Sequence, residues 1–111
     1  MNIYDTANKL AQEIKQSEEY MNYKMAKETL SLKPELKKKI EEFETARYDA
    51  QITAMQTGKN DEEKTKKMQQ LYIELFKNAD ATKFFEAETK FNIILADVNK
   101  IIGDAVMDVL K

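Results

Sequence analysis

Apolar residues recur every three or four positions along most of the sequence, a spacing that places them on one face of an α-helix. The first run begins near residue 2, where Asn2 and Asp5 resemble a capping box. A second run occupies about 18–31, after Ser17, a favoured N-cap residue. The pattern predicts two helices and leaves open whether the second continues the first.

A third helix is predicted from Pro34 to just before Gly58. Proline is tolerated at the first position of a helix, and glycine favours the left-handed conformation that follows one. The apolar face of this helix includes alanines four residues apart, which would let another helix approach closely: Leu36, Ile40, Phe43, Ala46, Ala50 and Ala54. The next segment, TGKND, reads as a tight turn, and Asn60 with Glu63 gives a second capping-box pattern that opens a fourth helix.

The fourth helix carries the apolar run Met68, Leu71, Tyr72, Leu75 and Phe76, and Asn78 either ends it or caps a fifth helix. The fifth pattern continues to the C-terminus. Roughly 31 residues at about 1.5 Å each make this helix about 46 Å long, which exceeds the width of a compact domain of this size. Its far end needs a partner, and a four-helix core shared by two copies of the chain is the expected solution.

These patterns predict an all-α fold, one domain over residues 1–111 built as a bundle of four to five helices with a long C-terminal helix. Pro34 is the only proline, so few positions can interrupt a helix. Phe85, Ile93 and Val106 lie off the main stripe of the last helix, which indicates two different neighbours. The stripe itself is predicted to be the dimer or partner interface, through Phe84, Phe91, Ile94, Val98, Ile101, Ile102 and Ala105.

The sequence contains neither histidine nor cysteine. Without histidine it lacks a base poised near neutral pH, a Ser-His-Asp arrangement and the Glu-x-x-His pairs of a di-iron bundle. Without cysteine it lacks disulfides, thiolate nucleophiles and iron–sulfur ligands. We therefore expect no catalytic residues, no cofactor and no specific metal site.

Cellular location follows from the same composition. A chain without cysteine fits a reducing compartment. The start, MNIYDTANKL, lacks the basic and apolar regions of a signal peptide, and the densest apolar run, FNIILADV, is far shorter than the ~20 residues that span a bilayer. A cytoplasmic protein without a membrane anchor is expected.

Other candidate chemistry has simpler explanations. Gly58-Lys59 resembles the end of a phosphate-binding loop, but Thr53 occupies the position of the first glycine and Asn60 that of the final Ser or Thr. The acidic pairs 41–42 and 62–63 are typical of solvated helix faces. Aromatic residues of the last two helices could line a ligand pocket, but their spacing favours core or interface.

The run Lys37, Lys38 and Lys39 is the most basic segment and could contact RNA phosphates, with Tyr48 stacking on a base. A solvated face is favoured, because Glu41 and Glu42 can pair with these lysines at i,i+4 and because adjacent helical residues point in different directions. The formal charge of −2 also gives no overall attraction to a polyanion. Direct RNA binding is therefore the minor alternative.

Several segments together resemble the YlbF/YmcA family of small bacterial helical proteins, most closely its YheA-like branch. They are NIYDTANKL at the start, SEEY at Ser17–Tyr20, Gly58 before an acidic helix start, and AETKFNIILADVNKII at Ala87–Ile102. The resemblance covers essentially the whole chain. It implies an all-helical fold, intertwined homodimers and no catalytic residues.

Two family members, YlbF and YmcA, act in a cytoplasmic complex that influences competence, biofilm formation, sporulation and RNase Y-dependent RNA maturation and that is associated with iron–sulfur clusters. This sequence departs from that picture because it has no cysteine to offer a cluster. The leading hypothesis is a non-enzymatic, homodimeric protein that binds other proteins as a regulatory or scaffolding subunit. The alternative is an RNA-processing factor associated with a ribonuclease.

Overall fold

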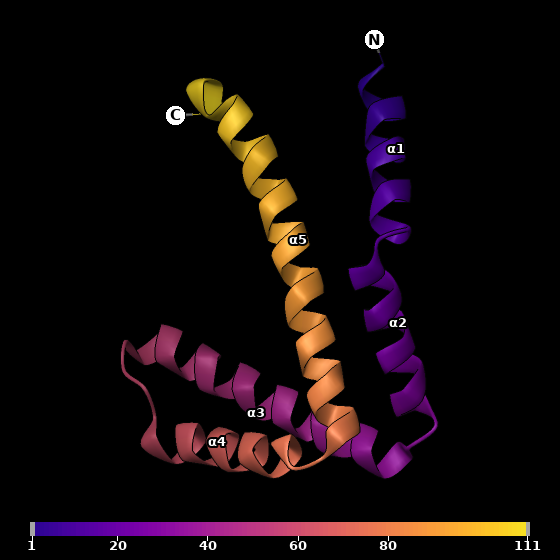
Figure 1. Ribbon diagram of the computed structural model, residues 1–111. Helices are drawn as coiled ribbons and strands as arrows, with labels where there is room; N and C mark the ends of the chain where they lie inside the picture. The colour runs from indigo at the N-terminus through magenta and orange to yellow at the C-terminus, as the bar shows by residue number, and fades with distance from the viewer. Residues whose placement is uncertain (1, 111) are drawn as a thin grey trace. The chain divides into compact units, whose positions relative to one another are not determined.

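The computed structural model describes residues 2–110, and within that range the chain forms five α-helices and no strand (Figure 1). They are α1 (Ile3–Lys15), α2 (Glu18–Ser31), α3 (Pro34–Thr57), α4 (Glu62–Phe76) and α5 (Ala79–Leu110). The last of these is also the longest, with 32 residues. The predicted all-α fold with a long C-terminal helix is thus confirmed, whereas the intertwined homodimer stays a prediction.

Polar side chains cap the N-termini of α1, α2 and α5. Asn2 Oδ1 accepts hydrogen bonds from the backbone N–H of Tyr4 at 2.9 Å and of Asp5 at 3.3 Å. Ser17 Oγ accepts from the N–H of Tyr20 at 3.2 Å, so α2 starts as a separate helix and does not continue α1. Asn78 Oδ1 accepts from the N–H groups of Asp80 and Ala81 at 2.9 and 3.2 Å, so this residue caps α5.

The start of α4 differs by one residue from the prediction. Asp61 is the N-cap, and its carboxylate accepts the backbone N–H of Lys64 at 3.1 Å; Asn60 precedes the cap. Both residue types cap well, and an ionised carboxylate is also favoured at the positive end of a helix. The limits of α3 agree with the prediction, since Pro34 begins it and Gly58 follows it with φ of 74°.

The chain divides into two compact units. One contains the described residues before Lys27 and from Phe84 onward, and the other is Lys27–Lys83. The expectation of one domain over residues 1–111 stays a prediction.

In the unit Lys27–Lys83, α3 and α4 lie side by side as an antiparallel hairpin (Figure 1). Two ion pairs join the helices across this hairpin, Lys64 to Asp49 at 3.2 Å and Lys39 to Glu74 at 3.3 Å. Such exposed pairs contribute little stability, so burial of apolar side chains is the main favourable contribution. The buried set is Leu30, Leu36, Ile40, Phe43, Leu75 and Ala81.

In the other unit, α2 packs on the first part of α5 through aromatic rings. The ring of Tyr23 lies 5.8 Å from that of Phe84 and 5.6 Å from that of Phe91, and its hydroxyl donates to Glu88 Oε2 at 3.4 Å. Further along α5 this packing stops, and every residue from 99 to 110 is exposed. None of the residues of α1 is buried.

Gly103 lies in this exposed end of α5, and a Cβ atom added to it would meet nothing within 4 Å. Glycine inside a helix costs roughly 0.5–1 kcal/mol relative to alanine. We expect Gly103→Ala to raise the free energy of unfolding by about that amount, measured by urea denaturation followed by circular dichroism. Gly58→Ala should instead destabilise the protein, because Gly58 has positive φ. A destabilising effect of Gly103→Ala would contradict the open surroundings of this residue.

Candidate functional site: the distal surface of α5 and the α3–α4 groove

The structure separates the predicted interface residues of α5 into three groups. Phe84 is buried within its own chain, with 4% of its surface exposed. Phe91, Ile94 and Val98 are half-buried, and Ile101, Ile102 and Ala105 are exposed. The predicted stripe therefore starts in the core and ends on the surface. Its role in binding a partner stays a prediction.

The exposed end of α5 carries more apolar side chains than the stripe alone. We call the following set the distal α5 surface: Ile101, Ile102, Ala105, Val106, Met107, Val109 and Leu110. Ile101 is 69% exposed and Val109 78%. The sequence did not predict Met107 and Leu110 as interface residues, because they lie off the main stripe of the last helix. Val106 had indicated that this helix has a second apolar side. Contiguous exposed apolar surface of this kind marks interaction sites in proteins.

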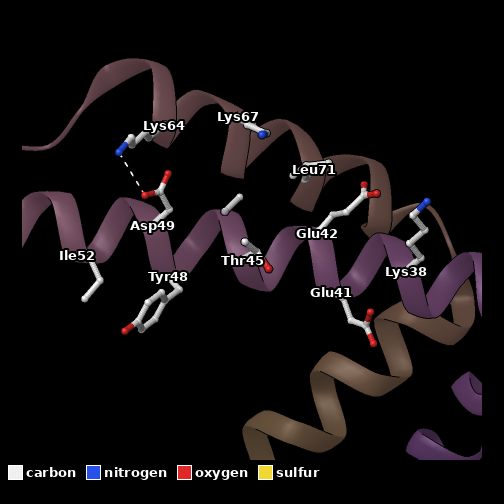
Figure 2. A pocket seen from close by; sticks show the side chains of 11 residues that line it. Lys38, Glu41, Glu42, Thr45, Tyr48, Asp49, Ile52, Lys64, Lys67 and Leu71 are labelled. Atoms are coloured by element: carbon white, nitrogen blue, oxygen red, sulfur yellow. Dashed lines mark hydrogen bonds and ion pairs between the residues drawn. The ribbon is translucent and has the colours of Figure 1, made fainter.

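A second feature is an open groove of about 720 Å³ on the α3–α4 hairpin (Figure 2). Helix α4 contributes Lys64, Lys67 and Leu71 to its lining. The lining residues from α3 are Lys38, Glu41, Glu42, Thr45, Ala46, Tyr48, Asp49 and Ile52. Sequence reasoning did not predict this groove, because the charged residues read as solvated helix faces.

Only part of the charge in the groove is neutralised within the chain. Lys64 Nζ donates to Asp49 Oδ1 at 3.2 Å (Figure 2). It also donates to Thr53 Oγ1 at 2.7 Å, and both bonds connect α4 to α3 at one end of the groove. Within residues 2–110, Lys67, Glu41 and Glu42 form no ion pair. These three side chains are available to an incoming charged group.

The three consecutive lysines are exposed but do not act as one surface. Lys38 lines the groove, whereas Lys39 Nζ bonds to Glu74 Oε1 at 3.3 Å. Lys37 does neither. Tyr48, the predicted stacking residue, is 66% exposed and also lines the groove. A weak RNA contact through Lys37, Lys38 and Lys39 stays a prediction that the geometry does not strengthen.

Across residues 2–110, no three acidic side chains come close enough together to hold a metal ion. None of the helices there is both long and apolar enough to cross a membrane. The candidate functional features are two separate surfaces, the distal α5 surface in one unit and the α3–α4 groove in the other.

The chain is similar in sequence to a family of known proteins. A family profile described as control of competence regulator ComK, YlbF/YmcA, matches residues 3–107. A UPF0342 protein of Desulfitobacterium hafniense is 36% identical over 110 residues, which cover 99% of this chain and 89% of that protein. A UPF0342 protein of Clostridium novyi is 33% identical over 108 residues, covering 97% and 95%.

A solved structure is similar as well. It is the crystal structure of Bacillus subtilis RicA in complex with RicF, which matches with a TM-score of 0.62 and 28% sequence identity. The match covers 98% of this chain and 96% of that one. The similarity therefore extends over nearly the whole fold, including the long last helix.

Proposed function

The chain belongs to the YlbF/YmcA family, and from this premise we propose that it is a non-enzymatic subunit that acts by binding proteins. The observation that carries the proposal is the distal α5 surface, where Ile101, Ile102 and Val109 are 69%, 53% and 78% exposed. Leaving such side chains in water forgoes roughly 1.5–3 kcal/mol for each one that a partner could bury. The similar RicA structure, which is a complex with RicF, supports the same mode of action.

One of the proposed partners is a second copy of the same chain. Helix α5 has 32 residues, about 48 Å at about 1.5 Å per residue, and its last part is exposed in a single chain. Two copies could cover each other along this part, as symmetric homo-oligomers commonly do. The proposed role is regulatory or scaffolding, in the cytoplasm. An RNA-processing complex is the alternative setting.

The proposal is tested by affinity capture from cells that naturally make the protein, followed by mass spectrometry. The bait is the full chain, and the matched control is Ile102→Glu, which places a charge on the distal α5 surface. We expect specific proteins to bind the parent chain and to be lost, at least tenfold, with Ile102→Glu, because an unpaired charge in an apolar interface is costly.

Nuclease treatment of the lysate distinguishes direct protein binding from association within an RNA-processing complex. Direct protein binding should survive the treatment, whereas an RNA-bridged association should disappear. Recovery of the same proteins with both baits would contradict a binding role for the distal α5 surface.

A further inference from the structure

We propose that the α3–α4 groove receives helix α1 of a second copy of this chain. The inference rests on the proposed self-association and adds which segment of one copy enters which site of the other.

Helix α1 has an apolar face that its own chain covers only in part, since Ile3 and Ala7 are exposed while Leu10 and Ile14 are half-buried. Ile3, Ala7, Leu10 and Ile14 recur at helical spacing and so share one side of α1. None of the α1 residues is buried, and Ile3 is 81% exposed. An amphipathic helix in this state is suited to lay its apolar face in a groove of another molecule.

The groove has the length and floor that such a helix requires. Its α3 wall extends from Lys38 to Ile52, about 21 Å at about 1.5 Å per residue. From Ile3 to Lys15, α1 spans about 18 Å on the same basis. Ala46, Leu71 and Ile52 supply apolar surface, and the small Ala46 side chain favours close approach of a third helix.

The charges on the two sides of the groove differ in sign. On the α4 wall Lys67 is unpaired, whereas Lys64 is already bonded to Asp49 of α3 at 3.2 Å. The α3 wall presents the unpaired carboxylates of Glu41 and Glu42, with Lys38 as its basic member at one end. An incoming helix is therefore matched when it carries an acidic group on one edge of its apolar face and a basic group on the other.

Helix α1 carries this arrangement. At about 100° per residue, Glu13 and Lys15 fall on opposite edges of the face that contains Leu10 and Ile14. Neither residue forms an ion pair within the part of the chain that the structure describes. Glu13 would face Lys67 and Lys15 would face the carboxylates of α3. Reversing the direction of α1 would exchange these edges, so the charges also select one orientation.

A small molecule fits the groove less well. Sites for small ligands depend on a few polar groups placed in a mainly enclosed pocket. Here the groove is open, and Lys64 and Asp49 are already bonded to each other. Among the residues that the structure describes, no buried side-chain polar atom lacks a hydrogen-bond partner. The apolar floor and charged edges are the features of a helix-binding groove.

Cross-linking tests the placement directly, since the chain has no cysteine of its own. Glu13→Cys and Lys67→Cys are made in separate full-length chains with different mass tags, mixed, and treated with a short bis-maleimide. We expect a cross-chain product at least tenfold more abundant than with Lys66→Cys, a neighbouring position on α4 that is exposed and outside the groove. Equal yields for Lys67→Cys and Lys66→Cys would overturn the proposal.

Charge exchange gives an independent measurement. Lys67→Glu and Glu13→Lys should each weaken self-association about threefold, as expected for a pair at the rim of an interface. A chain with both substitutions should regain the parent affinity, whereas Lys66→Glu should change it little. Sedimentation velocity over a concentration series supplies the dissociation constants. Additive losses in the double variant would overturn the pairing.

The outcomes also separate this inference from the proposed function. A parent chain that is monomeric would remove the self-association on which the inference rests. A dimeric parent without the 13–67 product would leave self-association in place and overturn only the groove assignment. If a Glu13→Cys, Lys67→Cys double variant cross-linked within one chain while the two single variants did not react together, the occupant would be the chain's own α1 and the proposal would fail.

Discussion

Ile94→Asp is expected to abolish self-association, to unfold the chain, or to do both. Ile94 is half-buried on α5 between Phe91 and Val98, on the side that leads to the distal α5 surface. An unpaired carboxylate in an apolar interface costs several kcal/mol, which is comparable with the whole stability of a small domain. Light scattering across a concentration series reports the mass, and circular dichroism reports the helix content.

The matched control is Lys100→Asp on the same helix. Lys100 is exposed and forms an i,i+4 ion pair with Asp104 at 3.3 Å, a pair type worth about 0.2–0.5 kcal/mol. Loss of this ion pair should leave the proposed dimer intact. A parent chain that is a well-folded monomer at tens of micromolar, or an Ile94→Asp variant that stays dimeric with unchanged melting, would refute the proposed role of α5.

Phe84→Ala is expected to lower the free energy of unfolding by about 3–5 kcal/mol, the usual cost of truncating a buried aromatic residue. Only 4% of Phe84 is exposed, and its ring lies 5.8 Å from that of Tyr23 and 5.5 Å from that of Phe85. Because it connects α2 with α5, its removal leaves a cavity at the centre of this packing. Urea denaturation followed by circular dichroism measures the change.

Ile73→Ala serves as the comparison for this measurement. Ile73 is 60% exposed on α4, and exposed substitutions usually change stability by no more than about 0.5 kcal/mol. If Phe84→Ala cost as little as Ile73→Ala, Phe84 would not belong to the core. Its predicted place in an interface would then become the better interpretation.

The helices could be predicted because the signals that set their ends are local. Asn2 and Ser17 accept backbone N–H groups within three residues of themselves, Pro34 acts through its fixed φ angle and missing N–H, and Gly58 acts through its own φ angle. The one-residue difference at α4 arose because Asn60 and Asp61 are both good caps. Choosing between them depends on the geometry of the turn, which the two residue types alone do not determine.

The candidate site was less predictable for the opposite reason. The groove brings Asp49 together with Lys64, residues on different helices, and neither helix alone shows this pairing. On α5 the same apolar spacing runs through Phe84, which is buried, and Ile101, which is exposed. Periodicity identifies a face of a helix, but which part of that face the chain itself covers depends on where α2 packs.

The exposed end of α5 has a thermodynamic consequence for assembly. An isolated helix of fewer than about 12–15 residues is only marginally stable in water, and the segment beyond residue 98 has this length and no buried residue. Its helix–coil equilibrium is therefore linked to binding, because a partner that covers the segment also orders it. Part of the gross interaction energy is consumed by this ordering, and the remainder sets the measured affinity. If a partner covers this segment, protection of its amide hydrogens against exchange with solvent is expected to increase with the concentration of that partner.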